Sequence, residues 1–294
     1  MGRAISDKFM NDLKSGGLSD LLEAVHNDTN LIMELRGNSV IIYYRGGALF
    51  TVNDSNGEYQ VSYNPAYWEI RKKYDEMVEM PSISDCVKYI ALYKDQMDYH
   101  MANSKRNLEK QCQQHMVMEN NILGKVVPGD KANKSFTTGD YFILDIEYAF
   151  KDGKNLDARF DALALKWPSL AANRKKRRSL GISFVELKYY DGAMAGRSGI
   201  IKHIGDYLRF VKRPEYIEMC RDMEKVFYQK CELGLIPSYT SRLKTDSEKY
   251  YNISIDEKKP EFIFIFANRD PDSAIAKREL NAAIEEYGSE AVKD

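Results

Sequence analysis

The sequence predicts an α/β protein, because strand-like and helix-like patterns of apolar residues alternate along the chain. Four short runs rich in β-branched and aromatic residues lie near the N-terminus. Three further strand patterns, two helix patterns and one nearly all-apolar run follow in the second half. The 294 residues are 44% apolar and 30% charged, so the chain can bury a sizeable core and is not disordered as a whole.

The N-terminal part is expected to form short helices followed by an antiparallel β-meander. Residues 1–28 read as one or two helices with a break at Gly16 and Gly17. Turn signals rich in Gly, Asn and Asp separate the four strand patterns. These strand patterns are Leu31–Arg36, Val40–Arg45, Ala48–Asn53 and Glu58–Tyr63. We expect residues 1–80 to form a recognition or interaction module and residues 81–294 to form a second domain.

The rest of the chain predicts helices around a second sheet. We expect helices over 66–80 and 82–122, followed by a loop over 124–140. The later elements are three strands, two helices, a fourth strand and a terminal helix: Tyr141–Phe150, Ala158–Trp167, Gly181–Tyr190, Ile200–Val211, Pro214–Gly234, Glu261–Ala267 and Pro271–Tyr287. The sequence EFIFIFA of the fourth strand predicts burial on both of its faces.

The charge of the chain is uneven although its net value is only −1. Residues 151–213 hold 15 Lys and Arg against 6 Asp and Glu, whereas the flanking parts are both acidic. A local anionic partner is one explanation, and loops that collect charge are another. The densest basic run is expected to contact nucleic-acid phosphates or to be a solvated loop. It consists of Arg174, Lys175, Lys176, Arg177 and Arg178.

Several classes of protein are disfavoured by the composition. No apolar run approaches the ~18 residues of a transmembrane helix, and residues 1–20 lack the apolar segment of a secretory signal. The four cysteines are widely spaced and form no CxxC pair, which disfavours a structural zinc site. Reduced thiols in a cytoplasmic protein without a membrane partner are the simplest expectation.

Three charged residues lie within apolar strand patterns. Because side chains alternate along a strand, Glu186 and Lys188 are expected on one face, about 7 Å apart at their Cα atoms. Asp161 joins them if its strand pairs with theirs. Two converging carboxylates repel unless a proton or a cation lies between them, and Mg²⁺ prefers such oxygen ligands. The arrangement fits metal-assisted phosphodiester hydrolysis, whereas the alternative is a buried salt bridge.

This layout resembles the PD-(D/E)XK nuclease superfamily, whose restriction-endonuclease-like core is a mixed central sheet flanked by helices. The resemblance covers roughly residues 105–270 and leaves the N-terminal meander unexplained. Asp161 matches the first acidic position of the motif, while Glu186 and Lys188 match its D/E-x-K part. Phe160 stands where the motif has its proline. The order of elements also matches: a helix, three meandering strands, a helix and a fourth strand.

The resemblance implies roles for these residues. Asp161, Glu186 and the main-chain carbonyl of Leu187 would hold Mg²⁺, for which Mn²⁺ is a candidate substitute, and Lys188 would be the catalytic lysine. Further candidates lie on the first core helix, the first strand and the helix after the E-x-K strand: Glu109 with Glu119 as its rival, Glu147 together with Asp145, and Lys202, His203 and Tyr207. Arg197, in a Gly-rich loop, is a candidate phosphate contact. Solvated faces and ordinary packing are the plain alternatives.

The function these expectations favour is a Mg²⁺-dependent nuclease acting on nucleic acid, with DNA favoured. A homodimer is a candidate assembly, since nuclease domains of this kind often pair to cut two strands. One alternative is a catalytically inactive module that keeps the nuclease fold and binds nucleic acid or assembles with proteins. Another is a scaffold that contacts proteins through the N-terminal meander.

Overall fold

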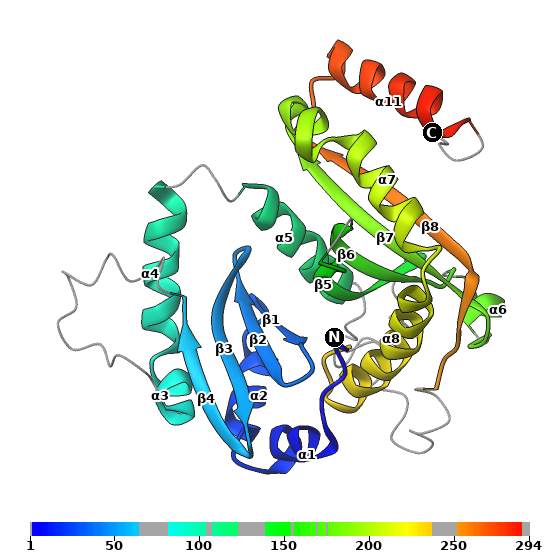
Figure 1. Cartoon of the computed structure of the whole chain (residues 1–294). Helices are drawn as coiled ribbons and strands as arrows, with labels where there is room; N and C mark the ends of the chain where they lie inside the picture. The colour runs from blue at the N-terminus through cyan, green and yellow to red at the C-terminus, as the bar shows by residue number, and fades with distance from the viewer. Residues whose placement is uncertain are drawn as a thin grey trace. The chain divides into compact units, whose positions relative to one another are not determined.

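A computed structural model describes most of the chain and divides it into two compact units (Figure 1). The described residues are 2–64, 82–103, 108–122, 139–153, 156–168, 170–174, 176–236 and 252–289. Unit 1 comprises Met1–Asp140, Ser169–Arg177 and Asp222–Ile253, and unit 2 comprises Tyr141–Pro168, Arg178–Arg221 and Ser254–Asp294. The division falls within helix α8 (Pro214–Glu232), so its first part belongs to unit 2 and its last part to unit 1.

Unit 1 contains a four-stranded antiparallel meander in the order β1-β2-β3-β4, as the sequence predicts. Its strands are β1 (Leu31–Leu35), β2 (Ser39–Tyr44), β3 (Gly47–Ser55) and β4 (Glu58–Tyr63). Two of its hairpins use two-residue loops, Arg45-Gly46 and Asn56-Gly57, in which both residues have positive φ. Such loops match the right-handed twist of the strands they join. The turn signals accordingly place the strands to within two residues, although Arg45 lies in the loop and not in the strand.

Helices α1 (Asp7–Ser15), α2 (Ser19–Asn27), α3 (Ile83–Lys88) and α4 (Ile90–Asn103) share one core with this meander. Unit 1 also contains α5 (Leu108–Ile122) and the short α6 (Ala171–Arg174). Phe9 and Leu13 of α1 and Tyr93 of α4 are fully buried with Val40 and Phe50 of the sheet. The hydroxyl of Ser6 caps α1 by accepting a hydrogen bond from the amide of Phe9.

The single helix expected over 82–122 is wrong in part. Ser82 and Asp85 form a capping box that begins α3, and α3 ends before Tyr89, whose backbone leaves the helical conformation. The chain then restarts as α4. The helix expected over 66–80 lies outside the described residues, as does most of the loop expected over 124–140. Helices α3, α4 and α5 belong to unit 1, and the expected folding domains 1–80 and 81–294 stay a prediction.

Unit 2 contains a mixed four-stranded sheet in the order β5-β6-β7-β8. Its strands are β5 (Tyr141–Lys151), β6 (Asp157–Lys166), β7 (Leu180–Tyr189) and β8 (Ile255–Ala267). The first three pair antiparallel, and β8 lies parallel to β7. Helix α7 (Ile200–Phe210) follows β7 in the chain and runs along the sheet (Figure 1). The mixed α/β class, with an N-terminal meander and a second, mixed sheet, is therefore confirmed.

The burial expected for the fourth strand is wrong. Each residue of 261–267 is half-buried, because β8 lies at the edge of the sheet, where β7 is its neighbour. Phe262, Phe264 and Phe266 pack against a small core formed by α7 and the terminal helix α11 (Ala274–Tyr287). The apolar run therefore forms an edge strand, and its phenylalanines are covered by two helices. Among the described residues, no helix has both the length and the apolar character needed to cross a bilayer.

Candidate active site

Asp161 lies where the ladder between β6 and β7 ends. The last pair in the register of these strands is Ala162 opposite Val185. Asp161 directly precedes Ala162 on β6, and its carboxylate accepts a hydrogen bond of 2.7 Å from the main-chain amide of Leu187. The side chain of Asp161 thus takes the place of a main-chain partner at the edge of β7.

The contact also determines where the carbonyl of Leu187 points. In an extended strand the N–H and C=O groups of one residue point to the same side. The carbonyl of Leu187 is therefore directed toward the side of β7 from which Asp161 approaches. The structure brings the carboxylate of Asp161 to the main chain at Leu187, between Glu186 and Lys188. Asp161, Glu186 and Lys188 are the three positions that carry the motif.

Glu186 and Lys188 form a buried ion pair on one face of β7. Their side chains are only 5% and 4% exposed, and Nζ of Lys188 lies 2.7 Å from Oε1 of Glu186. The two residues share a face because they are two positions apart on a strand. In water-poor surroundings this pair fixes the position of the ammonium group more firmly than a surface pair could.

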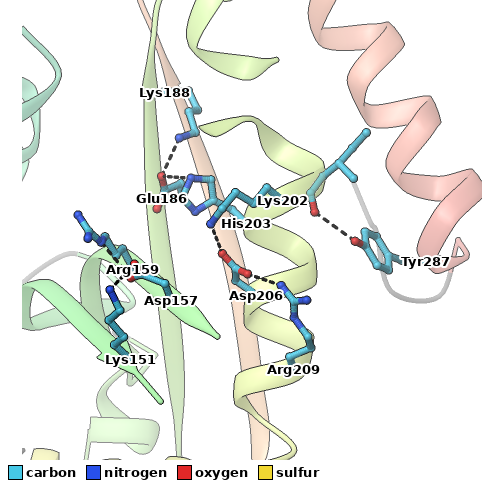
Figure 2. Close-up of polar contacts among 11 residues, drawn as sticks. Lys151, Asp157, Arg159, Glu186, Lys188, Lys202, His203, Asp206, Arg209 and Tyr287 are labelled. Carbon is cyan, nitrogen blue, oxygen red and sulfur yellow. Dashed lines mark hydrogen bonds and ion pairs between the residues drawn. The ribbon is translucent and has the colours of Figure 1, made fainter. Parts of the chain in front are cut away.

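His203 of α7 contacts the same carboxylate oxygen. Its Nε2 lies 3.1 Å from Oε1 of Glu186 (Figure 2). The pKa of His203 is lowered to about 4, first by burial and then by the positive charges of Lys188 and Lys202, while the charge of Asp206 acts in the opposite direction. The ring is therefore neutral near neutral pH, and its Nε2–H donates to Glu186.

The lowered pKa of His203 predicts a dependence of stability on pH. The folded-state pKa of about 4 lies below the ordinary value of 6.5, so the unfolded chain binds a proton more readily between these values. The free energy of unfolding should consequently fall as the pH drops from about 6.5 toward 4. A His203→Gln variant keeps an N–H donor for Glu186 and should show a weaker fall.

Urea denaturation of both proteins in EDTA, over this pH range, measures the difference. Because the other titrating groups are shared, the difference between the two proteins isolates the contribution of His203. The same pH dependence in both proteins would contradict the neutral state assigned to His203.

Tyr207 and Lys202 occupy different parts of α7. Tyr207 stacks on Phe262, with ring centroids 5.0 Å apart, and contacts the ring of Phe184 at 5.3 Å. Burial raises the pKa of Tyr207 to about 12, so this residue is a neutral packing group under the sheet. Lys202 is 45% exposed and pairs with Asp206 one turn further along the helix. Of the expected helix residues, His203 is therefore the one in direct contact with Glu186.

The acidic residues of β5 do not follow a regular alternation. The register with β6 shifts between Ile143 and Asp145, and Glu147 has a positive φ of 52°. Asp145 is buried at 1% exposure, which contradicts an exposed sheet face for this residue. Glu147 is half-buried and lies opposite Asp161 in the register, between the pairs Ile146–Ala162 and Tyr148–Phe160.

The other expected residues belong to unit 1 or have side chains outside the described residues, with the exception of Arg178. Glu109 lies on α5 in unit 1, and Glu119 of the same helix pairs with His115 at 3.7 Å. The basic run begins at the end of α6 in unit 1, and only Arg178 belongs to unit 2. Lys176 and Arg178 are exposed, whereas Lys175 and the side chains of Arg174 and Arg197 lie outside the described part of the structure.

Sequence reasoning missed Arg159, Lys151 and Arg209. Arg159 is 73% exposed and lies two positions before Asp161, so both residues are on the less buried face of this part of β6. Its position could have been inferred from the period of two along that strand. Lys151 comes from β5, and the pairing of β5 with β6 brings it to Asp157, which also contacts Arg159 (Figure 2). Arg209 comes from α7, where it contacts Asp206.

Asp161, Glu186 and the main-chain carbonyl of Leu187 offer oxygen ligands of the kind that Mg²⁺ and Mn²⁺ take. The carboxylate of Asp161 is hydrogen-bonded to the amide of Leu187, whereas that of Glu186 contacts Lys188 and His203. Within the described residues, no group of three or more His, Cys, Asp or Glu side chains is placed to hold a metal ion.

Comparison of the chain with protein-family models, curated proteins and solved structures finds no match.

Proposed function

We propose that the protein is a Mg²⁺-dependent nuclease that hydrolyses phosphodiester bonds, with DNA as the favoured substrate. The observation that carries the proposal is the contact between the carboxylate of Asp161 and the amide of Leu187. It joins the two halves of the motif across neighbouring strands. The antiparallel strands β5, β6 and β7, followed by α7 and α8 and by β8 parallel to β7, support a restriction-endonuclease-like core.

The residues around Asp161 define where a cation would be held. Asp161, Glu186 and the carbonyl of Leu187 would be its ligands, with Mn²⁺ as a substitute for Mg²⁺. Bound there, the ion would polarise a phosphate oxygen and lower the pKa of a coordinated water.

The remaining residues of the site position Lys188. Glu186 holds the ammonium group of Lys188, and His203 holds the carboxylate of Glu186. A lysine fixed in this way can orient a water for in-line attack or stabilise negative charge that develops on the phosphate. His203 is a positioning residue in this account, since its contact is to Glu186.

One observation favours a second candidate function. The side chains of Glu186 and Lys188 are almost fully buried, as in a structural ion pair. On this reading the protein is a catalytically inactive module that keeps the fold and binds nucleic acid.

A cleavage assay separates the two candidates. Single- and double-stranded DNA and RNA are incubated with the full chain in Mg²⁺, Mn²⁺ or EDTA. The nuclease proposal predicts cleavage of DNA with either metal and none in EDTA. Binding of DNA without cleavage under any condition would favour the inactive module, and equal cleavage in EDTA would contradict the metal-dependent mechanism.

A further inference from the structure

Four exposed basic side chains lie in unit 2 on β5, β6 and α7, the last of which also carries His203. We call them the cationic cluster: Lys151 of β5, Arg159 of β6, and Lys202 and Arg209 of α7 (Figure 2). Their side chains are 69%, 73%, 45% and 60% exposed, respectively. They come from three elements that the folding of unit 2 brings together.

The cluster holds more positive than negative charge. Asp157 lies 3.7 Å from Lys151 and 3.2 Å from Arg159, so one carboxylate is shared by two cations. Asp206 is shared in the same way by Lys202 and Arg209. Among these described side chains, four cations stand against two carboxylates, a balance of two positive charges.

A cation of α7 acts on the same carboxylate as those of the two strands. The pKa of Asp157 is lowered first by its hydrogen bond to Arg159, and also by the charges of Lys151 and of Lys202 on α7. The charge of Lys202 on α7 therefore acts on the same carboxylate as the cations of β5 and β6.

We propose that the cationic cluster is the surface that binds the phosphate backbone of the nucleic-acid substrate. The proposal rests on the proposed function for the identity of the polyanion. The four cations are exposed and spread over three elements, which suits successive phosphates along a strand.

The choice of variant follows from the burial of the two carboxylates. Asp206 is 2% exposed, so removing Lys202 and Arg209 together would leave a buried charge uncompensated. Asp157 is 44% exposed and stays solvated when its cations are removed. The double variant Lys151→Gln with Arg159→Gln is therefore the test. Its control is Lys258→Gln with Lys277→Gln, which removes the same charge from exposed positions on β8 and α11 of the same unit.

Fluorescence anisotropy of a labelled DNA duplex, titrated in EDTA at several salt concentrations, measures binding without cleavage. The cluster variant should bind about 10-fold more weakly, and the slope of log K against log salt should fall in magnitude by about 1–2, since each phosphate contact contributes about 0.9. The control should change much less on both measures.

Equal losses in the two double variants, no loss in the cluster variant, or no binding by the unmodified chain would overturn the proposal. The outcome is distinguishable from failure of the proposed function. A cluster-specific loss of binding in a protein that never cleaves DNA would retain the surface and reject the nuclease. Cleavage with unchanged binding by the cluster variant would retain the nuclease and reject the surface.

Discussion

Replacing Lys188 by Met is expected to lower the free energy of unfolding by about 3–5 kcal/mol, because the carboxylate of Glu186 would stay buried without this cation. Both side chains of the pair are at most 5% exposed, so water cannot replace the lost contact at low cost. The double variant Glu186→Gln with Lys188→Met removes both charges. It should recover most of the lost stability, since neither side chain then needs a counter-charge.

Urea denaturation of the unmodified protein, the single variant and the double variant measures these differences. The comparison also separates stability from catalysis, because the double variant should be folded and still inactive in the cleavage assay. A single variant within about 1 kcal/mol of the unmodified protein would show that the pair is solvated and not held in the interior.

Replacing Asp161 by Asn is expected to reduce metal-dependent cleavage by at least about 100-fold with little change in stability. The amide oxygen of Asn can still accept the hydrogen bond from the amide of Leu187, so the edge of β7 stays capped. What the variant loses is the negative charge that a cation needs from a ligand. Asp161→Ala removes the charge and the hydrogen bond together.

Initial rates of DNA cleavage in Mg²⁺, with urea denaturation of the same samples, test this prediction. Loss of cleavage in both variants, with stability lost mainly in Asp161→Ala, would agree with a metal ligand. Full activity of Asp161→Asn beside an inactive Asp161→Ala would reduce Asp161 to a cap for the main chain of β7.

The parts of the fold that the sequence predicts well are those determined locally. The Asn56-Gly57 loop requires positive φ at both positions, and it places β3 and β4 within a residue or two. The shared face of Glu186 and Lys188 follows from the period of two along a strand. Both features depend on a few neighbouring residues, so a pattern in the chain is enough to find them.

The parts that were missed depend on residues far apart in the chain. The EFIFIFA run is equally apolar in a central and an edge strand, and only the sheet order shows that β8 lies at an edge. The contact of Asp161 with Leu187 exists because the β6–β7 ladder ends at Ala162, a feature that no local pattern marks. The cationic cluster likewise joins three elements whose packing the charge count alone could not give.

The proposed nuclease requires Asp161, Glu186 and the carbonyl of Leu187 to hold one divalent cation beside Lys188. A crystal of the unmodified protein, soaked in Mn²⁺ and measured for anomalous scattering, would locate this ion. We expect a peak at about 2.0–2.4 Å from oxygens of both carboxylates and of the carbonyl. Glu186 still paired with Lys188, with no peak between it and Asp161, would rule out this cation site.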